Sequence, residues 1–177
     1  MPTPTPSVAA EALRDGRSVI IRPIRPDDIA RHAAFIDGLS PPSKHFLFLG
    51  GIARLSDAAL RQLCDPDYTH DMAYIAIAVD GGAPGQERQV GVCRYAGADI
   101  TFGAEISVAV ADDWQHQGLA RALLRRLIEH AREHGVHRLY SMDSINNERM
   151  RHLANAAGFT ERPDPDDIHQ VIYSLAL

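Results

Sequence analysis

The sequence predicts a single α/β (α+β) domain, and three observations indicate this class. The chain has 177 residues, enough for one domain with one core, and 45% of them are hydrophobic, which is ordinary for a globular protein. Apolar runs of strand length alternate along the chain with amphipathic segments of helix length. Their order is one strand, helices, three antiparallel strands, helix, strand, helix, strand. We expect the domain to span residues 15–177, after a disordered lead-in at residues 1–14 that is rich in proline and small residues.

Composition argues against several classes of function. No run of about 18 apolar residues is present, so no membrane span is predicted, and the N-terminus lacks the regions of a signal peptide. The two cysteines, Cys64 and Cys93, suit a reducing compartment and indicate a cytoplasmic protein. A net charge of −5 argues against nucleic acid as the main partner. Basic residues are nevertheless concentrated on the segment after Gly118, at Arg121, Arg125, Arg126 and Arg132.

The first half of the chain predicts one strand followed by short helices. Residues Arg17–Ile24 (RSVIIRPI) are β-branched and are stopped by Pro23 and Pro26, as a short strand would be. Asp27 or Asp28 can cap the first helix, since aspartate is a favoured N-cap residue. The expected helices cover residues 28–37, 43–48 and 56–65.

The second half predicts three strands in succession and then two helices, each followed by a strand. Met72–Val79 is a nearly continuous apolar run, typical of a buried strand. A loop with glycines and a proline at residues 80–88 connects it to its hairpin partner, Gln89–Tyr95. The remaining elements are a turn at 97–103, a strand at 104–110, a helix at 118–134, a strand at 137–142, a helix at 147–157 and a strand at 168–175.

The chain is organised around the stretch Ile106–Ala131, where a strand, a small-residue turn and a basic helix follow one another. The turn reads Q-x-x-G-x-A, from Gln115 to Ala120. A helix start presents unpaired N–H groups at the positive end of its dipole, so this junction predicts a site for an anion. Gly118 would let the backbone approach a phosphate, and the small Ala120 would leave it room. A tight strand-to-helix turn without a ligand is the alternative interpretation.

This turn resembles the pyrophosphate-binding loop, [RQ]-x-x-G-x-[GA], of the GNAT superfamily of acyl-CoA-dependent N-acyltransferases. The resemblance implies the fold of that family: a central mixed, mostly antiparallel, twisted sheet of about six to seven strands, flanked by helices and splayed at the acyl-CoA-binding strand. It implies acetyl-CoA as cosubstrate, held by the loop and by strand backbone that pairs with the pantetheine arm. By position, these cofactor-binding residues are Val108, Ala109, Val110, Gln115, His116, Gln117, Gly118, Leu119, Ala120 and Arg121.

A second motif, N-x-x-M-x-x-L-A-x-x-x-G-F, extends from Asn147 to Phe159. It is similar to the family's second cofactor motif, in which the asparagine side chain contacts the coenzyme A arm. Taken alone, Asn147 is better interpreted as a helix N-cap, because asparagine caps helices well. The two roles are compatible, and the presence of both motifs favours a coenzyme A contact.

Glu105 opens the strand that leads into the loop, and it is the candidate catalytic residue. Amide formation from an acyl thioester needs a neutral amine, and a nearby carboxylate can remove the amine's proton. Most of Leu13–Phe159 also resembles the acetyltransferase domain of bacterial Pat-type protein lysine acetyltransferases, in which the glutamate of A-E-[FI] is the base. That glutamate falls on Glu105 here. A solvent-exposed carboxylate at a strand start is the alternative.

The resemblance implies a primary amine as acceptor, either a protein lysine or a small molecule. A CoA-binding module without turnover, and an enzyme that uses another acyl-CoA, stay as alternatives. Many members of the family place a tyrosine four residues before Gly-Phe as general acid, but Ala154 stands here. The Pat-like group also lacks this tyrosine, so the thiolate would leave through water or through another donor such as Ser144 or His152. No metal is expected, because the pair His130 and His134 has no third ligand nearby in sequence. The oligomeric state is open, and a homodimer is one arrangement that fits.

Overall fold

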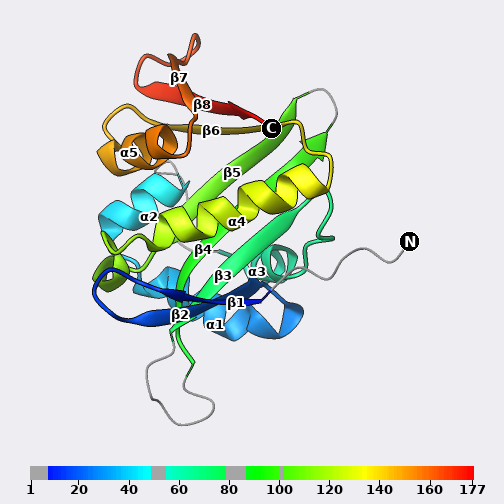
Figure 1. The fold of residues 1–177 in the computed structure, drawn as a ribbon, viewed down its shortest axis with the longest axis vertical. Coiled ribbons are helices and arrows are strands. Elements are labelled where there is room, and N and C mark those ends of the chain that lie inside the picture. The colour runs from blue at the N-terminus through cyan, green and yellow to red at the C-terminus, as the bar shows by residue number, and fades with distance from the viewer. Residues whose placement is uncertain (1–7, 49–54, 79–86, 100–101) are drawn as a thin grey trace.

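A computed structural model describes residues 8–48, 55–78, 87–99 and 102–177. Within them, eight strands form one sheet in the order β1-β2-β3-β4-β5-β6-β8-β7 (Figure 1). Neighbouring strands are antiparallel except for β5 and β6, which run parallel. In chain order the strands are β1 (Ala9–Ala12), β2 (Ser18–Pro23), β3 (Met72–Ala78), β4 (Gln89–Asp99), β5 (Gly103–Val110), β6 (Arg138–Ser144), β7 (Thr160–Pro163) and β8 (Gln170–Ala176).

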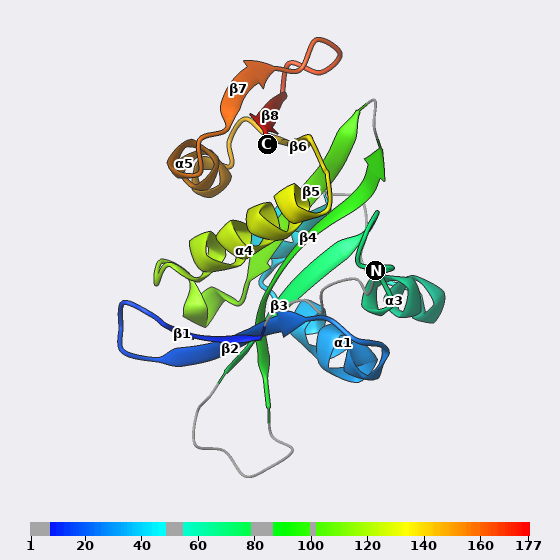
Figure 2. The same ribbon diagram turned by 45° about the vertical axis from the view of Figure 1, so that its right-hand side comes forward.

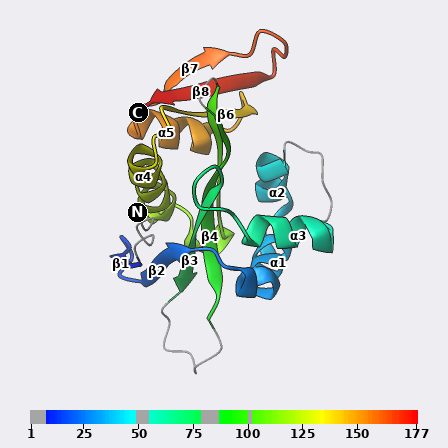
Figure 3. The ribbon, with the colours of Figure 1, turned by 90° about the vertical axis from the view of Figure 1, so that its right-hand side faces the viewer.

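Helices cover both faces of the sheet, in two separate groups. Figure 3 shows the first three helices on one face and the last two on the other. The first group is α1 (Ile29–Gly38), α2 (Pro41–Phe48) and α3 (Asp57–Cys64), and the second is α4 (Leu119–Glu133) and α5 (Glu148–Ala156). Two short 3-10 turns, η1 (Pro26–Asp28) and η2 (Asp112–Trp114), precede α1 and α4. None of the helices in the described ranges is long and apolar enough to cross a membrane.

The long helix α4 packs its apolar stripe on the middle of the sheet. Leu119, Leu123, Leu127 and Ala131 recur at helical spacing and are all buried. A glycine on β4 makes the close approach possible, because a Cβ atom at Gly91 would lie 2.9 Å from the Cδ1 atom of Leu123. Helix α4 is thereby held against β3, β4 and β5, and its first turn is fixed beside the end of β5.

The two parallel strands meet at one end only. Ladder pairs join Ala104 to Leu139 and Glu105 to Tyr140, and no later pair joins β5 to β6 within the described residues. The backbones are very close at this junction: a Cβ atom at Gly103, whose φ is +87°, would lie 2.3 Å from the carbonyl oxygen of Arg138. Beyond the junction the strands diverge, as the expected splay requires.

The predicted fold class is confirmed, and most helices and strands lie within about two residues of their expected bounds, as is usual for helix ends. The expected count of six to seven strands is too low by at least one, because neither β1 nor β7 was foreseen. The expectation of disorder over residues 1–14 is wrong for Ala9–Ala12, which pair with residues 18–21 of β2. Edge pairing with β2 and an ion pair from Glu11 to Arg125 order this short segment despite its weak strand propensity.

Strand β4 is also longer than expected, and the turn assigned to residues 97–103 is correspondingly shorter. The strand continues to Asp99, past Gly97, whose φ is +65°. The backbone N–H of Gly97 donates to Asp71 Oδ1 at 2.8 Å, which supports this irregular stretch. Of the loop expected at 80–88, residues 80–86 lie outside the described part of the chain, as does Val79 of the expected strand.

Candidate active site

A cavity of about 440 Å³ opens where β5 and β6 separate. Its walls are β5, the second half of β6, helix α5, the loop before α4 with the first turn of α4, and part of α2. It brings together eleven of the twelve residues that the sequence analysis singled out, namely Glu105, Val108, Ala109, Val110, Gln115, His116, Gly118, Leu119, Ala120, Arg121 and Asn147. Of the predicted base and cofactor-binding residues, Gln117 is the one outside the cavity lining; its carbonyl oxygen accepts a hydrogen bond from the Arg14 N–H at 3.2 Å.

Glu105 stands on the cavity wall at the junction of β5 and β6. Its side chain is exposed, while Ile106 beside it is buried. Within the described residues, the Glu105 carboxylate makes no ion pair or hydrogen bond with another side chain. It is therefore free to meet a ligand that enters the cavity. From Glu105 to Val110 the strand rises about 17 Å at roughly 3.4 Å per residue, so the carboxylate and the helix start are separated by an extended channel.

The loop between β5 and α4 forms a concave helix start. Gly118 is the N-cap of α4 with a φ of +91°, and His116 adopts a positive φ of +63° although it is not glycine. Such a conformation costs a non-glycine residue of order 1 kcal/mol, and it is found most often at functional sites. No side chain caps the helix, so the N–H groups of the first turn remain available to an anion.

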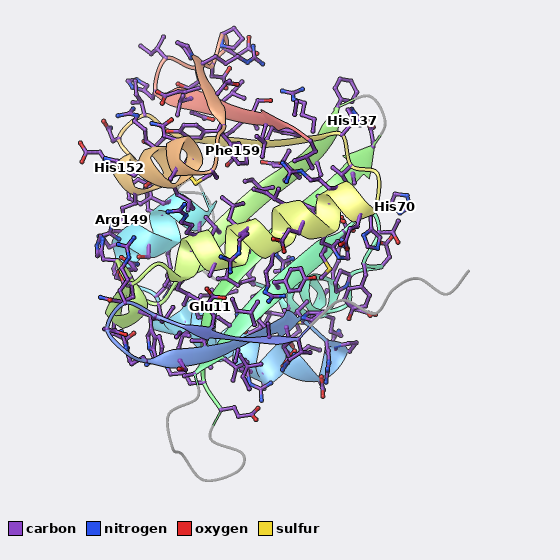
Figure 4. The ribbon with its side chains drawn as sticks, in the orientation of Figure 1. Glu11, His70, His137, Arg149, His152 and Phe159 are labelled. Carbon is purple, nitrogen blue, oxygen red and sulfur yellow. The ribbon has the colours of Figure 1, made fainter. Side chains whose placement is uncertain are left out.

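Gln115 braces the loop against three other elements. Its Nε2 atom donates to the carbonyl oxygen of Val110 at 3.0 Å and to Ser43 Oγ at 3.4 Å. Its Oε1 atom accepts from the Arg149 guanidinium on α5; Figure 4 shows Arg149 and His152 on this helix. The side chain thus holds the loop in place, and a contact of Gln115 with the cofactor stays a prediction.

Asn147 is the N-cap of α5, as one of its two proposed roles required. Its Oδ1 atom accepts from the Met150 N–H at 3.2 Å, and its Nδ2 atom donates to Asp143 Oδ1 and Oδ2 at 3.1 and 3.2 Å. The side chain is buried and both of its polar ends have partners in the protein. A contact with coenzyme A stays a prediction.

Asp143, on β6, was not identified from the sequence. It is buried and lines the cavity, where burial raises the pKa of its carboxyl above the ordinary value. Hydrogen bonds from Asn147 and from the Ser144 N–H offset only part of this effect. An aspartate near the end of a strand is common, so the sequence alone does not mark Asp143 as a site residue. Its hydrogen bonds with Asn147, which only the structure shows, identify it as one.

The loop is also anchored to α2 by a carboxylate. Asp112 Oδ1 accepts from the hydroxyls of Ser40 and Ser43, at 2.7 and 2.9 Å, and its Oδ2 atom accepts from the Ser40 N–H. Burial alone would raise the pKa of Asp112, but these hydrogen bonds outweigh it and lower the pKa below its ordinary value. Trp114 packs beneath the loop with 2% of its surface exposed.

Two histidines at the end of α4, His130 in the helix and its C-cap His134, contact each other. The rings of His130 and His134 stack with centroids 3.8 Å apart, and His130 Nε2 bonds to the Tyr68 carbonyl oxygen at 2.9 Å. No group of three potential ligands gathers in the ranges that the structure describes. Of the two candidate donors to a leaving thiolate, His152 lines the cavity and Ser144 does not.

A splayed parallel strand pair that ends at an open helix start suits an extended ligand with an anionic group at one end. This is the class of site that fold and cavity define. Comparison with known proteins specifies the class further. Residues 46–159, more than half of the chain, match the acetyltransferase (GNAT) family. The chain therefore belongs to the GNAT family of acetyltransferases.

Individual relatives agree with this assignment. The chain is 46% identical over 167 residues to "Acetyltransferase PA5475" of Pseudomonas aeruginosa, covering 94% of this chain and 88% of that protein. The crystal structure of the GNAT domain of S. lividans PAT superimposes with a TM-score of 0.83 at 27% identity, over 96% of this chain and 97% of that one. RimL, a ribosomal L7/L12 alpha-N-protein acetyltransferase solved with coenzyme A, shares the fold with a TM-score of 0.70 at 16% identity, over 90% and 94%.

Proposed function

We propose that the protein transfers an acetyl group from acetyl-CoA to a primary amine, with Glu105 as the general base. Membership of the acetyltransferase family supplies the reaction class. The observation that carries the proposal is the continuous cavity, which joins the exposed Glu105 carboxylate at one end to the open start of α4 at the other. An extended acyl thioester with a diphosphate matches both ends.

Glu105 would act on the acceptor amine. A lysine-type amine is mostly protonated near pH 7, so a carboxylate at the thioester must first take a proton, directly or through a water. The neutral nitrogen then attacks the thioester carbon, an N–C bond forms, and the C–S bond breaks to release the thiolate of coenzyme A. The second proton of the nitrogen passes to this thiolate, which leaves the amide and the free thiol as products. No chemical group beyond the acyl donor, the amine and the base is needed to balance this step.

The backbone of β5 would stabilise the negative charge that develops on the thioester oxygen. Beyond Glu105 this strand is not paired with β6 in the described residues, so N–H groups near Val108 face the cavity without a ladder partner. A fixed donor aimed at a developing oxyanion can contribute about 3–4 kcal/mol to lowering the barrier. The same unpaired backbone can hydrogen-bond to the amides of a pantetheine arm in the manner of an added strand.

We further propose a protein lysine as the acceptor. The similarity to the GNAT domain of S. lividans PAT supports this choice, and so does the exposure of Glu105, since a large acceptor can reach it. A small-molecule amine, and an acyl group other than acetyl, are the competing assignments. They differ in the acceptor or donor and share the chemistry at Glu105.

The test is turnover of acetyl-CoA with purified protein and a panel of lysine peptides, proteins and small amines, read by thiol release and by product mass. Glu105→Gln is expected to lower kcat by roughly 10²–10⁴-fold and to leave coenzyme A affinity within about twofold, because Gln keeps the shape of the side chain.

Two results would contradict the catalytic assignment, and a third would contradict the proposed acceptor. Tight binding of acetyl-CoA with no transfer to any acceptor would identify a binding module without turnover. An unchanged kcat in Glu105→Gln would remove Glu105 as the base. Faster turnover of small amines than of every lysine peptide and protein would reject the protein acceptor and keep the enzyme.

A further inference from the structure

The turn between β1 and β2 is fastened to the loop that precedes α4. The Arg14 N–H donates to the Gln117 carbonyl oxygen at 3.2 Å. Arg17 Nη2 donates to the Asp113 carbonyl oxygen at 2.9 Å, and the Arg17 guanidinium lies 3.8 Å from the centroid of the Trp114 ring. Figure 2 shows this turn reaching from the edge of the sheet to the start of α4. The N-terminal hairpin is therefore part of the same assembly as the loop.

Strand β1 is tied to α4 as well. Glu11 Oε2 and Arg125 Nη2 are 3.0 Å apart, which links the edge strand to the second turn of the helix. Two separate attachments, one at the turn and one at the strand, thus fix the hairpin relative to the helix start. A side chain carried by this turn is held in a defined position at the mouth of the cavity.

Arg14 is that side chain. It lines the cavity together with Gly118 and Arg121, and its Nε atom lies 3.9 Å from the point that a Cβ atom at Gly118 would occupy. Two other arginines near this hairpin have acidic partners, since Arg17 pairs with Asp15 and Arg125 pairs with Glu11. Within the described residues, the Arg14 guanidinium has no ion pair or side-chain hydrogen bond. Its charge faces the space above the helix start without compensation.

We propose that Arg14 binds a phosphate of coenzyme A, either the diphosphate or the 3′-phosphate. A guanidinium presents a planar set of donors that matches a phosphate, and the N–H groups of the α4 start converge on the same space. This inference rests on the proposed use of the cavity for coenzyme A. It adds a contact from outside residues 46–159, the segment that matches the family.

The test measures dissociation constants by calorimetry for three ligands, coenzyme A, 3′-dephospho-CoA and pantetheine. Arg14→Ala is expected to weaken coenzyme A binding roughly tenfold or more, as the loss of a charge-assisted hydrogen bond does, and to leave pantetheine binding unchanged. Arg14→Lys, which keeps the charge without the planar donors, is expected to fall between. Arg132→Ala, with the same charge change on the exposed far end of α4, is the matched control.

The ligands identify the phosphate. If the loss in Arg14→Ala disappears with 3′-dephospho-CoA, Arg14 contacts the 3′-phosphate; if it persists, Arg14 contacts the diphosphate. Equal affinities of Arg14→Ala and wild type for coenzyme A would overturn the inference, and so would an equal loss in Arg132→Ala or for pantetheine. Failure of the wild type to bind coenzyme A would instead overturn the proposed function, and this inference with it.

Discussion

At the scale of single residues, Asn147 connects helix α5 to the buried Asp143 on the cavity wall. One end of the side chain caps α5 and the other holds the buried Asp143 carboxylate. Asn147→Ala removes both bonds. Lost caps cost about 1 kcal/mol, and a buried acceptor left without its donor costs about 1–3 kcal/mol more. We expect a loss of about 2–4 kcal/mol in the free energy of unfolding, measured by urea titration.

Ser56→Ala is the matched control for this loss. Ser56 caps α3 through its bond from the Ala59 N–H and holds no buried carboxylate. Ser56→Ala should therefore lower the free energy of unfolding only by the contribution of the helix cap, about 1 kcal/mol. An equal loss in the two variants would mean that the bond to Asp143 contributes nothing to stability.

His32 predicts a pH dependence of stability. It is 2% exposed and lies against Gln89, and burial lowers the pKa of its imidazole from 6.5 to about 4. The unfolded chain takes up the proton at the higher pH, so stability is complete above pH 6.5 and falls as the pH drops toward 4. Between pH 6.5 and 5 the loss amounts to about 2 kcal/mol at 1.36 kcal/mol per pH unit.

The measurement compares urea unfolding of the wild type and of His32→Gln at pH 7.5, 6.5 and 5. Other groups that titrate are common to both proteins, so their effects cancel in the difference. We expect the wild type to lose more stability than the variant over this interval. A difference that does not change with pH would show that His32 keeps an ordinary pKa in the folded protein.

Some site residues could be predicted from the local sequence alone, but the residues that they contact in the folded protein could not. Gly118 and Asn147 carry local signals, a positive φ at a turn and a cap before a helix, that a short window of sequence contains. Arg14 and Asp143 matter because of what the fold places beside them. Sequence distance hides such contacts: Arg14 and Gln117 meet only when β1 and β2 lie next to the α4 start.

At the scale of elements, the junction of β5 and β6 depends on a glycine. Gly103→Ala places a Cβ atom 2.3 Å from the Arg138 carbonyl oxygen, at a φ of +87° that L residues rarely adopt. Backbone must move, and we expect a loss of more than about 3 kcal/mol in the free energy of unfolding, well above the usual effect of one substitution. Circular dichroism during urea titration measures it.

Gly135→Ala separates the clash from the backbone conformation. Gly135 also has a positive φ, +74°, at the end of α4, but a Cβ atom there would meet no atom within 4 Å. Its replacement should cost only the strained conformation, about 1–2 kcal/mol. Similar losses at the two glycines would indicate that the β5–β6 junction relaxes to accept the methyl group.

The elements that were missed share a physical cause. Strand β7 has four residues, all exposed, and ends in proline, so it shows neither alternation nor an apolar face. Strand β1 follows a proline-rich start and is mostly alanine. Both are edge strands that form because a neighbour, β8 or β2, offers unpaired backbone. Long elements with an internal apolar period, such as α4, carry their own signal and were predicted within a residue.

At the scale of the whole molecule, charge distribution predicts a salt dependence. The chain has a net charge of −5, so it repels a polyanionic ligand at long range, while arginines at the cavity mouth attract it locally. Interactions with exposed charges weaken as the Debye length shrinks from about 10 Å at 0.1 M salt to about 3 Å at 1 M. We expect coenzyme A binding to weaken several-fold across this range. Pantetheine, which lacks the phosphates, should bind almost independently of salt, and calorimetry at four salt concentrations compares the two.

The opposite result has a clear meaning. If coenzyme A binds more tightly at high salt, or if both ligands respond alike, net repulsion or apolar burial outweighs the local arginines. The basic cavity mouth would then have no measurable part in affinity.

The splay of the sheet has a mechanical consequence. Strands β1–β5 form one continuously paired block and β6, β8 and β7 form another; within the described residues, two ladder positions beside Gly103 join the blocks at one end. We expect such a joint to act as a hinge, because a small rotation there would change the gap little near Glu105 and more toward the α4 start. A ligand bound in the gap would contact both blocks where β5 and β6 are not paired, and it would restrict their movement relative to each other. The protein would then be stiffest while it holds its cosubstrate and most pliant between turnovers.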